Sequence, residues 1–177
     1  GYYKTKMIDI AESMGVSKGA IYQYFDSKQD LLLSVLETHT NTRGEEVEKF
    51  VASGGIAEIA TEEFFDRMLS MRLGTLVLNL DLLREAAVNE LVLKWVKVSF
   101  ESWVEGLVSI IERFKKAGTI KGHIDSESIA RGILALRDGL YSSISLETNI
   151  SKVRRTWVTI LRLLMLEILV NPGQQEL

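Results

Sequence analysis

Residues 91–117 form one long stretch with a helical pattern, and this stretch constrains the fold more than any other part of the chain. Its polar side chains recur along a narrow stripe, at Lys94, Lys97, Glu101, Glu105, Glu112 and Lys116. Nearly every other position is apolar, and Gly118 ends the pattern. A helix that is apolar around most of its circumference must be covered by other elements on several sides. The stretch therefore predicts a long central helix in a helical protein.

The composition agrees with an all-α fold. The chain has 177 residues, of which 46% are hydrophobic, and it contains one proline and no cysteine. Average usage would give roughly nine prolines, and proline interrupts helices, so its scarcity leaves long stretches free to be helical. No alternating run of apolar and polar residues indicates a strand. A chain without cysteine forms no disulfide, thiolate metal site or cysteine nucleophile.

Several classes of function are disfavoured by what the sequence lacks. The chain has two histidines, His39 and His123, which lie far apart in the sequence, so we predict no metal and no cofactor. No serine stands in a nucleophile motif followed by a plausible base, so we predict no catalytic residue. The sequence contains no run of about 18 uncharged apolar residues, which a membrane span would need. The N-terminus does not resemble a secretion signal. A soluble, cytoplasmic protein is the expectation.

Glycines and capping residues divide the rest of the chain into helices. Besides 91–117, the expected helices cover 5–13, 17–24, 26–52, 57–72, 76–87, 125–146 and 151–171. The third begins at Asp26 or Ser27, and the last two begin at Asp125 or Ser126 and at Ser151, all residue types that cap helices. We expect two domains, one at 1–44, whose linking helix continues to about 52, and one at 45–177.

Residues 5–16 have the features of the first half of a helix–turn–helix. Ile8, Ala11 and Met14 are expected on one apolar face, and the small Ala11 allows a second helix to approach closely. Gly15 is suited to the left-handed backbone of a tight corner between two helices. Ser17 is expected to cap the second helix.

The second helix is expected to present small and polar groups away from the core. Ile21 and Phe25 hold it on the core, and a short helix of this kind suits a major groove. The Gln23 amide suits a base edge, and Ala20 a thymine methyl group. Hydroxyls, lysines and free backbone N–H groups suit phosphate oxygens. The predicted DNA-contacting residues are Thr5, Lys6, Ser17, Lys18, Gly19, Ala20, Tyr22, Gln23, Tyr24 and Lys28.

The net charge of the chain is weak evidence for or against nucleic-acid binding. The net charge of −3 argues mildly against nucleic-acid binding. It averages over the whole chain, however, and residues 1–28 carry four lysines against three acidic residues. The balance of +1 in this segment predicts a DNA affinity that depends on salt without extreme sensitivity.

The combination of these residues resembles the tetracycline-repressor (TetR) family of transcription regulators. The resemblance covers roughly the first 35 residues and is carried by Gly1-Tyr2, Thr5, Ile10-Ala11, Gly15-Val16-Ser17-Lys18-Gly19, Ile21-Tyr22, Tyr24-Phe25, Ser27-Lys28 and Leu31-Leu32. It implies a dimeric repressor with N-terminal DNA-binding heads and a C-terminal ligand-binding body. By position it also implies that Tyr22 and Lys28 bind phosphates and that residues 18–20 and Gln23 face the bases.

The sequence departs from the family pattern in two places. Lys6 stands where the family often has a threonine. The family's first helix, which precedes the Gly-Tyr pair, is missing from the sequence, so we expect the natural protein to begin a helix's length upstream.

The body contains a set of large apolar and methionine side chains with two interpretations. They are either ordinary core or the lining of an effector pocket, which is typically apolar with a few polar groups. We predict a pocket for a partly apolar small molecule, lined by Met68, Met71, Leu76, Leu80, Leu83, Trp95, Phe100, Trp103 and Leu107.

The last helix is apolar nearly all round, and such a terminal helix is rarely left exposed on a monomer. Burial inside one protomer is the alternative to a homodimer built on an isologous four-helix interface. We predict an interface formed by Leu136, Leu140, Ile144, Trp157, Ile160, Leu161, Leu164 and Ile168. Arg137 and Asp138 are expected to form a pair near it.

The sequence thus predicts a ligand-responsive regulator, most simply a repressor, whose partners are a double-stranded operator and a small-molecule effector. Two other interpretations remain open. A helical dimerisation or scaffold protein would carry the same body with a vestigial DNA-reading surface. An activator would use the same residues and differ only in promoter geometry.

Overall fold

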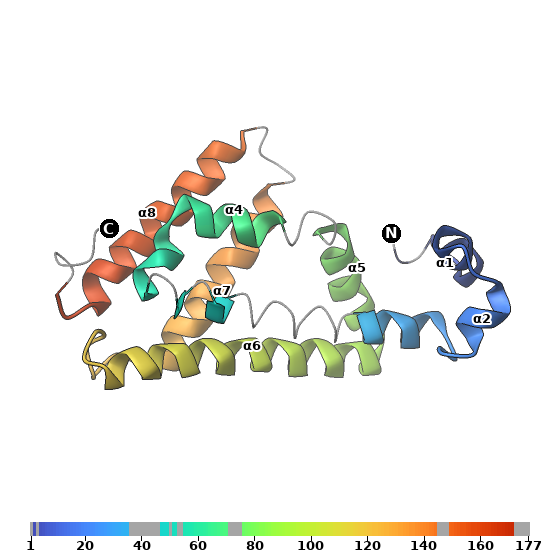
Figure 1. Ribbon diagram of the computed structural model, residues 1–177, viewed down its shortest axis with the longest axis horizontal. Helices are drawn as coiled ribbons and strands as arrows, with labels where there is room; N and C mark the ends of the chain where they lie inside the picture. The colour runs from blue at the N-terminus through green and yellow to red at the C-terminus, as the bar shows by residue number, and fades with distance from the viewer. Residues whose placement is uncertain are drawn as a thin grey trace. The chain divides into compact units, whose positions relative to one another are not determined.

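The computed structural model is built from helices (Figure 1), and the all-α prediction is confirmed. It describes residues 2, 4–35, 47–49, 51–52, 55–70, 76–144 and 149–171. Within these ranges there is no strand, and Ile120 and Leu169 form an isolated antiparallel bridge. No helix in the same ranges has the length and apolar character needed to cross a membrane.

The helices follow the predicted order. They are α1 (Met7–Met14), α2 (Lys18–Tyr22), a helix at 28–35, helical turns at 47–49 and 51–52, the 3-10 helix η1 (Ile56–Ala60), α4 (Glu62–Ser70), α5 (Leu76–Ala86), α6 (Glu90–Lys116), α7 (Ser126–Ser143) and α8 (Ile150–Ile168). Asp125 caps α7 as predicted, by accepting a hydrogen bond from the Glu127 N–H at 3.2 Å.

Several boundaries differ from the prediction, and two of these differences have a local cause in the hydrogen bonding. The single helix expected at 57–72 is divided at Thr61, whose backbone is extended and whose hydroxyl accepts a hydrogen bond from the Phe64 N–H at 3.2 Å. The last helix begins one residue before Ser151, because the Asn149 side chain accepts a hydrogen bond from the Ser151 N–H at 3.0 Å.

The chain forms two compact units. The N-terminal unit combines Gly1–Arg43 with Val77–Phe100, and the C-terminal unit combines Gly44–Leu76 with Glu101–Leu177. Helix α6 therefore contributes its first part to one unit and its second part to the other. The division of function at residue 44 stays a prediction.

Two small apolar clusters hold the N-terminal unit together. The first lies between α1 and α2 and contains Met7, Ala11 and Ile21, with Ile10 and Phe25 against them. The second joins the helix at 28–35 to α5 and α6 and contains Leu32, Leu82, Ala86 and Val92, with Tyr2, Trp95 and Val96 against them. The helix at 28–35, which follows the helix–turn–helix, therefore packs on two helices from later in the sequence.

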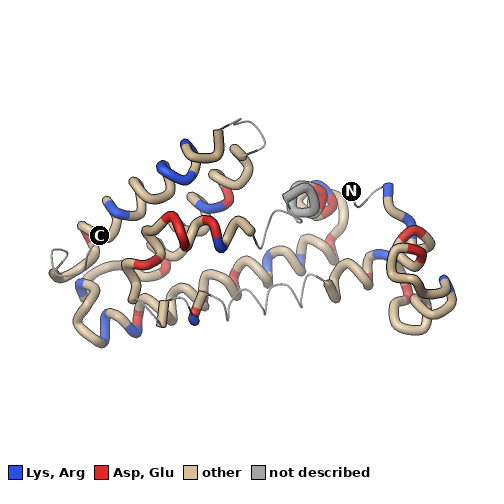
Figure 2. Tube along the Cα trace, turned by 45° about the horizontal axis from the view of Figure 1, so that its top comes forward, with Lys and Arg blue, Asp and Glu red and all other residues tan. Residues whose placement is uncertain are grey.

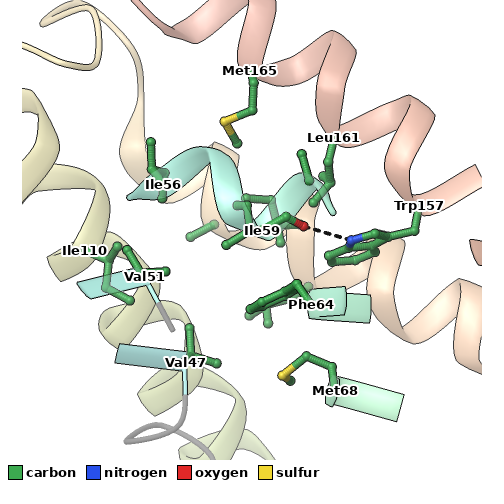
Figure 3. Close-up of a cluster of buried hydrophobic side chains, with 14 of the residues drawn as sticks. Val47, Val51, Ile56, Ile59, Phe64, Met68, Ile110, Trp157, Leu161 and Met165 are labelled. Atoms are coloured by element: carbon green, nitrogen blue, oxygen red, sulfur yellow. Dashed lines mark hydrogen bonds between the residues drawn. The ribbon is translucent and has the colours of Figure 1, made fainter. Parts of the chain in front are cut away.

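The larger core lies in the C-terminal unit, where α8 packs against η1, α4 and α7. Trp157 of α8 is its central residue. The indole ring is stacked on Phe64 with ring centroids 6.0 Å apart, and it also contacts Phe65. Its Nε1 donates a hydrogen bond to the Ile59 carbonyl at 2.8 Å (Figure 3). One side chain thus fastens α8 to both η1 and α4.

The turn between α6 and α7 is held by a polar cluster. Hydrogen bonds from Lys115 and Ser126 hold the pKa of the Glu112 carboxyl below its ordinary value. A hydrogen bond from the Ser128 hydroxyl does the same for the pKa of Asp125. Each of these groups is satisfied within the turn, so the cluster has a structural role.

Candidate functional site

The helix–turn–helix corner has the backbone that its sequence predicts. Gly15 adopts φ 68° and ψ 24°, in the left-handed region that only glycine enters readily. The Val16 N–H then returns to the Ala11 carbonyl at 3.0 Å and closes the end of α1. Ser17 caps α2 through a hydrogen bond from the Ala20 N–H to its Oγ at 3.1 Å. The two helices are thereby held at a fixed corner.

One face of this corner is buried and the other is exposed. Ala11 has 0% of its surface exposed, and Ile21 of α2 packs beside it. The apolar face of α1 differs from the predicted one, because Met7 and Ile10 join Ala11 in the cluster while Ile8 and Met14 are exposed.

Most of the predicted DNA-contacting residues lie on the exposed side. Lys6, Ser17, Lys18, Gly19, Tyr22, Gln23 and Tyr24 are exposed, and Thr5, Ala20 and Lys28 are half-buried. The Lys18 ammonium lies 5.6 Å from the centroid of the Tyr22 ring. Both acidic and basic residues occur along this part of the chain (Figure 2).

Lys28 has an internal role in the N-terminal unit. Its ammonium donates hydrogen bonds to the carbonyls of Tyr2 and Thr5, at 2.9 and 3.1 Å, and lies 4.2 Å from the centroid of the Tyr2 ring. The Tyr2 N–H in turn donates to the Asp81 carboxylate at 2.8 Å. Lys28 therefore ties the N-terminal segment to the helix at 28–35. The Lys28→Ala variant would lose these internal contacts as well as the predicted phosphate contact, so a change in its DNA affinity would not distinguish the two roles.

The cap at Ser17 gives a prediction about local stability. The Ser17→Ala variant loses the acceptor for the Ala20 N–H, so the free energy of unfolding of the N-terminal unit should fall by about 1 kcal/mol. Hydrogen exchange of the α2 amides measures this loss. The Ser17→Asp variant retains a capping acceptor and should keep most of the protection. Equal protection in the alanine variant and the wild type would contradict the role of the cap.

The C-terminal unit contains an apolar cavity. The space between its walls is about 540 Å³, part of it open to solvent. Val47, Val51 and Ile110 face Ile59, Phe64 and Met68 across it (Figure 3). The remaining lining residues are Ile56, Trp103, Leu107, Ile111, Ile133, Leu134, Arg137 and Trp157. An apolar lining with a few polar groups is typical of small-molecule sites.

The residues predicted to line an effector pocket are distributed over both units. Met68, Trp103 and Leu107 line the cavity. Leu83, Trp95 and Phe100 lie in the N-terminal unit, and Leu83 is 61% exposed. Met71 and the side chains of Leu76 and Leu80 lie outside what the structure describes.

Arg137 is the charged residue among those that line the cavity, whereas the sequence predicted it near the dimer interface. The predicted pair with Asp138 exists, since Arg137 Nε donates to Asp138 Oδ1 at 2.9 Å. The guanidinium, however, is buried in the cavity wall, 5.4 Å from the centroid of the Trp103 ring. The sequence does indicate that Arg137 is buried, because Ile133 and Tyr141 lie one turn before and one turn after it on the same face of the helix. Both of these side chains are buried in the structure.

The predicted interface residues fall into two groups. Trp157, Leu161 and Ile168 lie in the core of the protomer and present no surface to a second chain. Leu136, Leu140, Ile144 and Leu164 are half-buried, and Ile160 is exposed. The outer face of α8 carries Leu163 and Leu166 in addition, which are 59% and 51% exposed.

The N-terminal segment of the chain is similar in sequence to known transcription regulators. The family model for bacterial regulatory proteins of the tetR family matches residues 1–35. The HTH-type transcriptional activator FasR of Mycolicibacterium smegmatis is 46% identical over 41 residues, which are 23% of this chain and 19% of that protein. The matched segment thus spans about a fifth of that curated relative.

Solved structures extend the likeness in fold to most of the chain. A putative TetR-family transcriptional regulator from Rhodococcus sp. superposes with a TM-score of 0.73 at 20% identity, covering 93% of this chain and 89% of that one. The transcriptional regulator FadR from Bacillus subtilis, solved in complex with stearoyl-CoA, also gives a TM-score of 0.73 at 20% identity, covering 91% and 89%.

The chain thus combines a helix–turn–helix with a helical unit that contains an apolar cavity. Residues 1–35 match the model for the tetR family of bacterial regulatory proteins, and most of the chain has a fold similar to that of solved TetR-family regulators. The matched family and the curated relative are both named as regulators of transcription.

Proposed function

We propose that this chain is a ligand-responsive transcriptional regulator that binds a palindromic operator as a homodimer and releases it when a small molecule occupies the C-terminal cavity. The observation that carries the proposal is the helix–turn–helix corner, in which Gly15, Ser17 and Ala11 fix α2 with its polar side toward solvent. Such a function belongs in the compartment that holds the DNA, in keeping with the cytoplasmic location that the sequence predicts.

The exposed residues of α2, together with Gln23 at its C-terminal cap, have the chemistry to read a major groove. Gln23 offers an amide to a base edge, and Lys18 and Tyr22 offer a cation and a hydroxyl to phosphates. Two copies of α2, one from each protomer, would enter successive major grooves roughly 34–36 Å apart.

The outer face of α8 supports a homodimer. Ile160, Leu163 and Leu166 are all exposed on one protomer, and a row of large apolar side chains on a surface helix favours association. The same face on a second copy would give an isologous contact, the commonest kind in homodimers.

The cavity supports regulation by a ligand. The FadR structure with a similar fold was solved with stearoyl-CoA, so this fold accommodates small molecules. To change operator occupancy from 99:1 to 1:99, an effector needs about a 10⁴-fold preference for the released conformer. A repressor is the simplest form of the proposal; the curated relative FasR is named an activator, which makes activation the second candidate. Transcription from an operator-bearing promoter with and without the protein separates the two.

Variants on the exposed face of α2 test the proposal. Lys18→Ala should weaken operator binding at every sequence and reduce the slope of log affinity against log salt by about one. Gln23→Ala should lower discrimination at one base position by about 1–3 kcal/mol. Fluorescence anisotropy with the full-length protein and a labelled operator measures both.

Lys116→Ala is the matched control, because it removes an exposed lysine from the end of α6 in the C-terminal unit. Its operator affinity should equal that of the wild type. If Lys18→Ala and Lys116→Ala have the same effect, α2 does not read the operator. Absence of operator binding by the wild type at every salt concentration would favour the scaffold interpretation.

A further inference from the structure

A buried guanidinium interrupts the otherwise apolar wall of the cavity. Arg137 is 7% exposed, and its Nε donates to Asp138 Oδ1 at 2.9 Å. Within the part of the chain that the structure describes, Arg137 Nη1 and Nη2 donate to no protein acceptor. Buried polar groups are nearly always hydrogen-bonded, since an unpaired buried donor costs free energy. The far end of this guanidinium therefore needs an acceptor that the fold does not supply.

The surroundings of Arg137 define the shape of what would supply that acceptor. Trp103 lies against the guanidinium, and the other lining residues have aliphatic, aromatic or thioether side chains. The indole N–H of Trp157, another lining residue, already donates to Ile59. A ligand that fills this cavity must be apolar over most of its surface and carry its polar group beside Arg137.

We propose that the cavity binds an apolar molecule with a carboxylate head, whose two oxygens accept hydrogen bonds from Arg137 Nη1 and Nη2. The inference deepens the proposed function, on which it rests, by naming the chemical class of the effector. The apolar tail lies among Leu107, Ile111 and Met68 and removes these side chains from water.

A carboxylate fits this site better than other head groups. Guanidinium presents parallel N–H donors that match the two oxygens of a carboxylate, and it stays charged at all ordinary pH values. Asp138 occupies the Nε side of the fork and is 45% exposed at its side chain, so water screens its charge. A neutral alcohol offers one weaker acceptor, and an ammonium head has none.

Calorimetric titration of the full-length protein tests the proposal with probes that share one tail. Decanoate should bind at least tenfold more tightly than decanol, and decylamine more weakly than either. Octanoate and myristate show how tail length changes the affinity of the carboxylate. If decanol binds as tightly as decanoate, or if none of the three carboxylates binds, the proposal is overturned.

Substitution of Arg137 tests the contact itself. Arg137→Gln should weaken decanoate binding about tenfold or more and leave decanol binding within about twofold of the wild type. Arg137→Lys keeps the charge without the fork and should give an intermediate loss for decanoate. The control is Arg131→Gln on the same helix, because Arg131 forms ion pairs with Glu101 and Glu127 away from the cavity and its loss should not change decanoate binding.

Three readouts keep the result interpretable. Near-ultraviolet circular dichroism establishes that each variant folds, and if Arg137→Gln does not fold, the comparison of decanoate with decanol on the wild type decides alone. Undiminished decanoate binding by a folded Arg137→Gln variant overturns the proposal. Operator binding is measured on the same preparations, so that a protein that binds decanoate but no DNA disproves the proposed function and leaves the cavity assignment standing.

Discussion

Replacing Trp157 with alanine should lower the free energy of unfolding of the C-terminal unit by about 3–5 kcal/mol. Trp157 is 2% exposed, and its ring contacts Phe64 and Phe65. Its removal leaves a large void and deprives the Ile59 carbonyl of its indole donor. Urea denaturation followed by circular dichroism, at one fixed protein concentration, measures the loss.

Trp157→Phe separates packing from hydrogen bonding. It keeps an aromatic ring beside Phe64 but loses the N–H that reaches Ile59, so it should cost clearly less than the alanine variant. If both variants unfold at the urea concentration of the wild type, Trp157 does not join α8 to η1 and α4.

The double variant Leu163→Asp/Leu166→Asp should convert the proposed homodimer into monomers. Both side chains are exposed on the protomer, so the substitutions leave its core intact. In an apolar interface each would bury an unpaired carboxylate, which raises the dimer dissociation constant by about a hundredfold or more. Sedimentation velocity measures the change, and operator affinity should fall with it because both half-sites must be read together.

Val88→Asp is the control for added negative charge. Val88 is 81% exposed and precedes α6 in the N-terminal unit, whereas α8 belongs to the C-terminal unit. This variant should sediment as the wild type does. A double variant on α8 that remains dimeric would show that another surface joins the protomers.

Features set by local chemistry could be predicted from the sequence. A left-handed turn at Gly15 and caps at Ser17 and Asp125 depend on one residue and its nearest neighbours along the chain. The exposed side of α2 follows from the same local pattern, since Ile21 fixes which face is buried. The helix–turn–helix can therefore be predicted from the sequence alone.

Features that depend on which elements pack together could not be predicted in the same way. Helix α6 is apolar on several sides, and its sequence does not say that Trp95 belongs to one core while Trp103 lines a cavity in another. Arg137 was expected near the dimer interface, in a pair with Asp138. Its burial depends on Trp103 and on the helices around the cavity, which lie far away in sequence.

Selection of bound sequences from a pool of random double-stranded DNA tests the central claim most directly. We expect the full-length protein to enrich a palindrome whose half-sites lie one helical turn apart, as two copies of α2 in successive major grooves require. Binding to the selected site should weaken steeply as salt concentration rises. Failure of the folded protein to enrich any sequence, or equal binding to the selected and a scrambled site, would contradict the account.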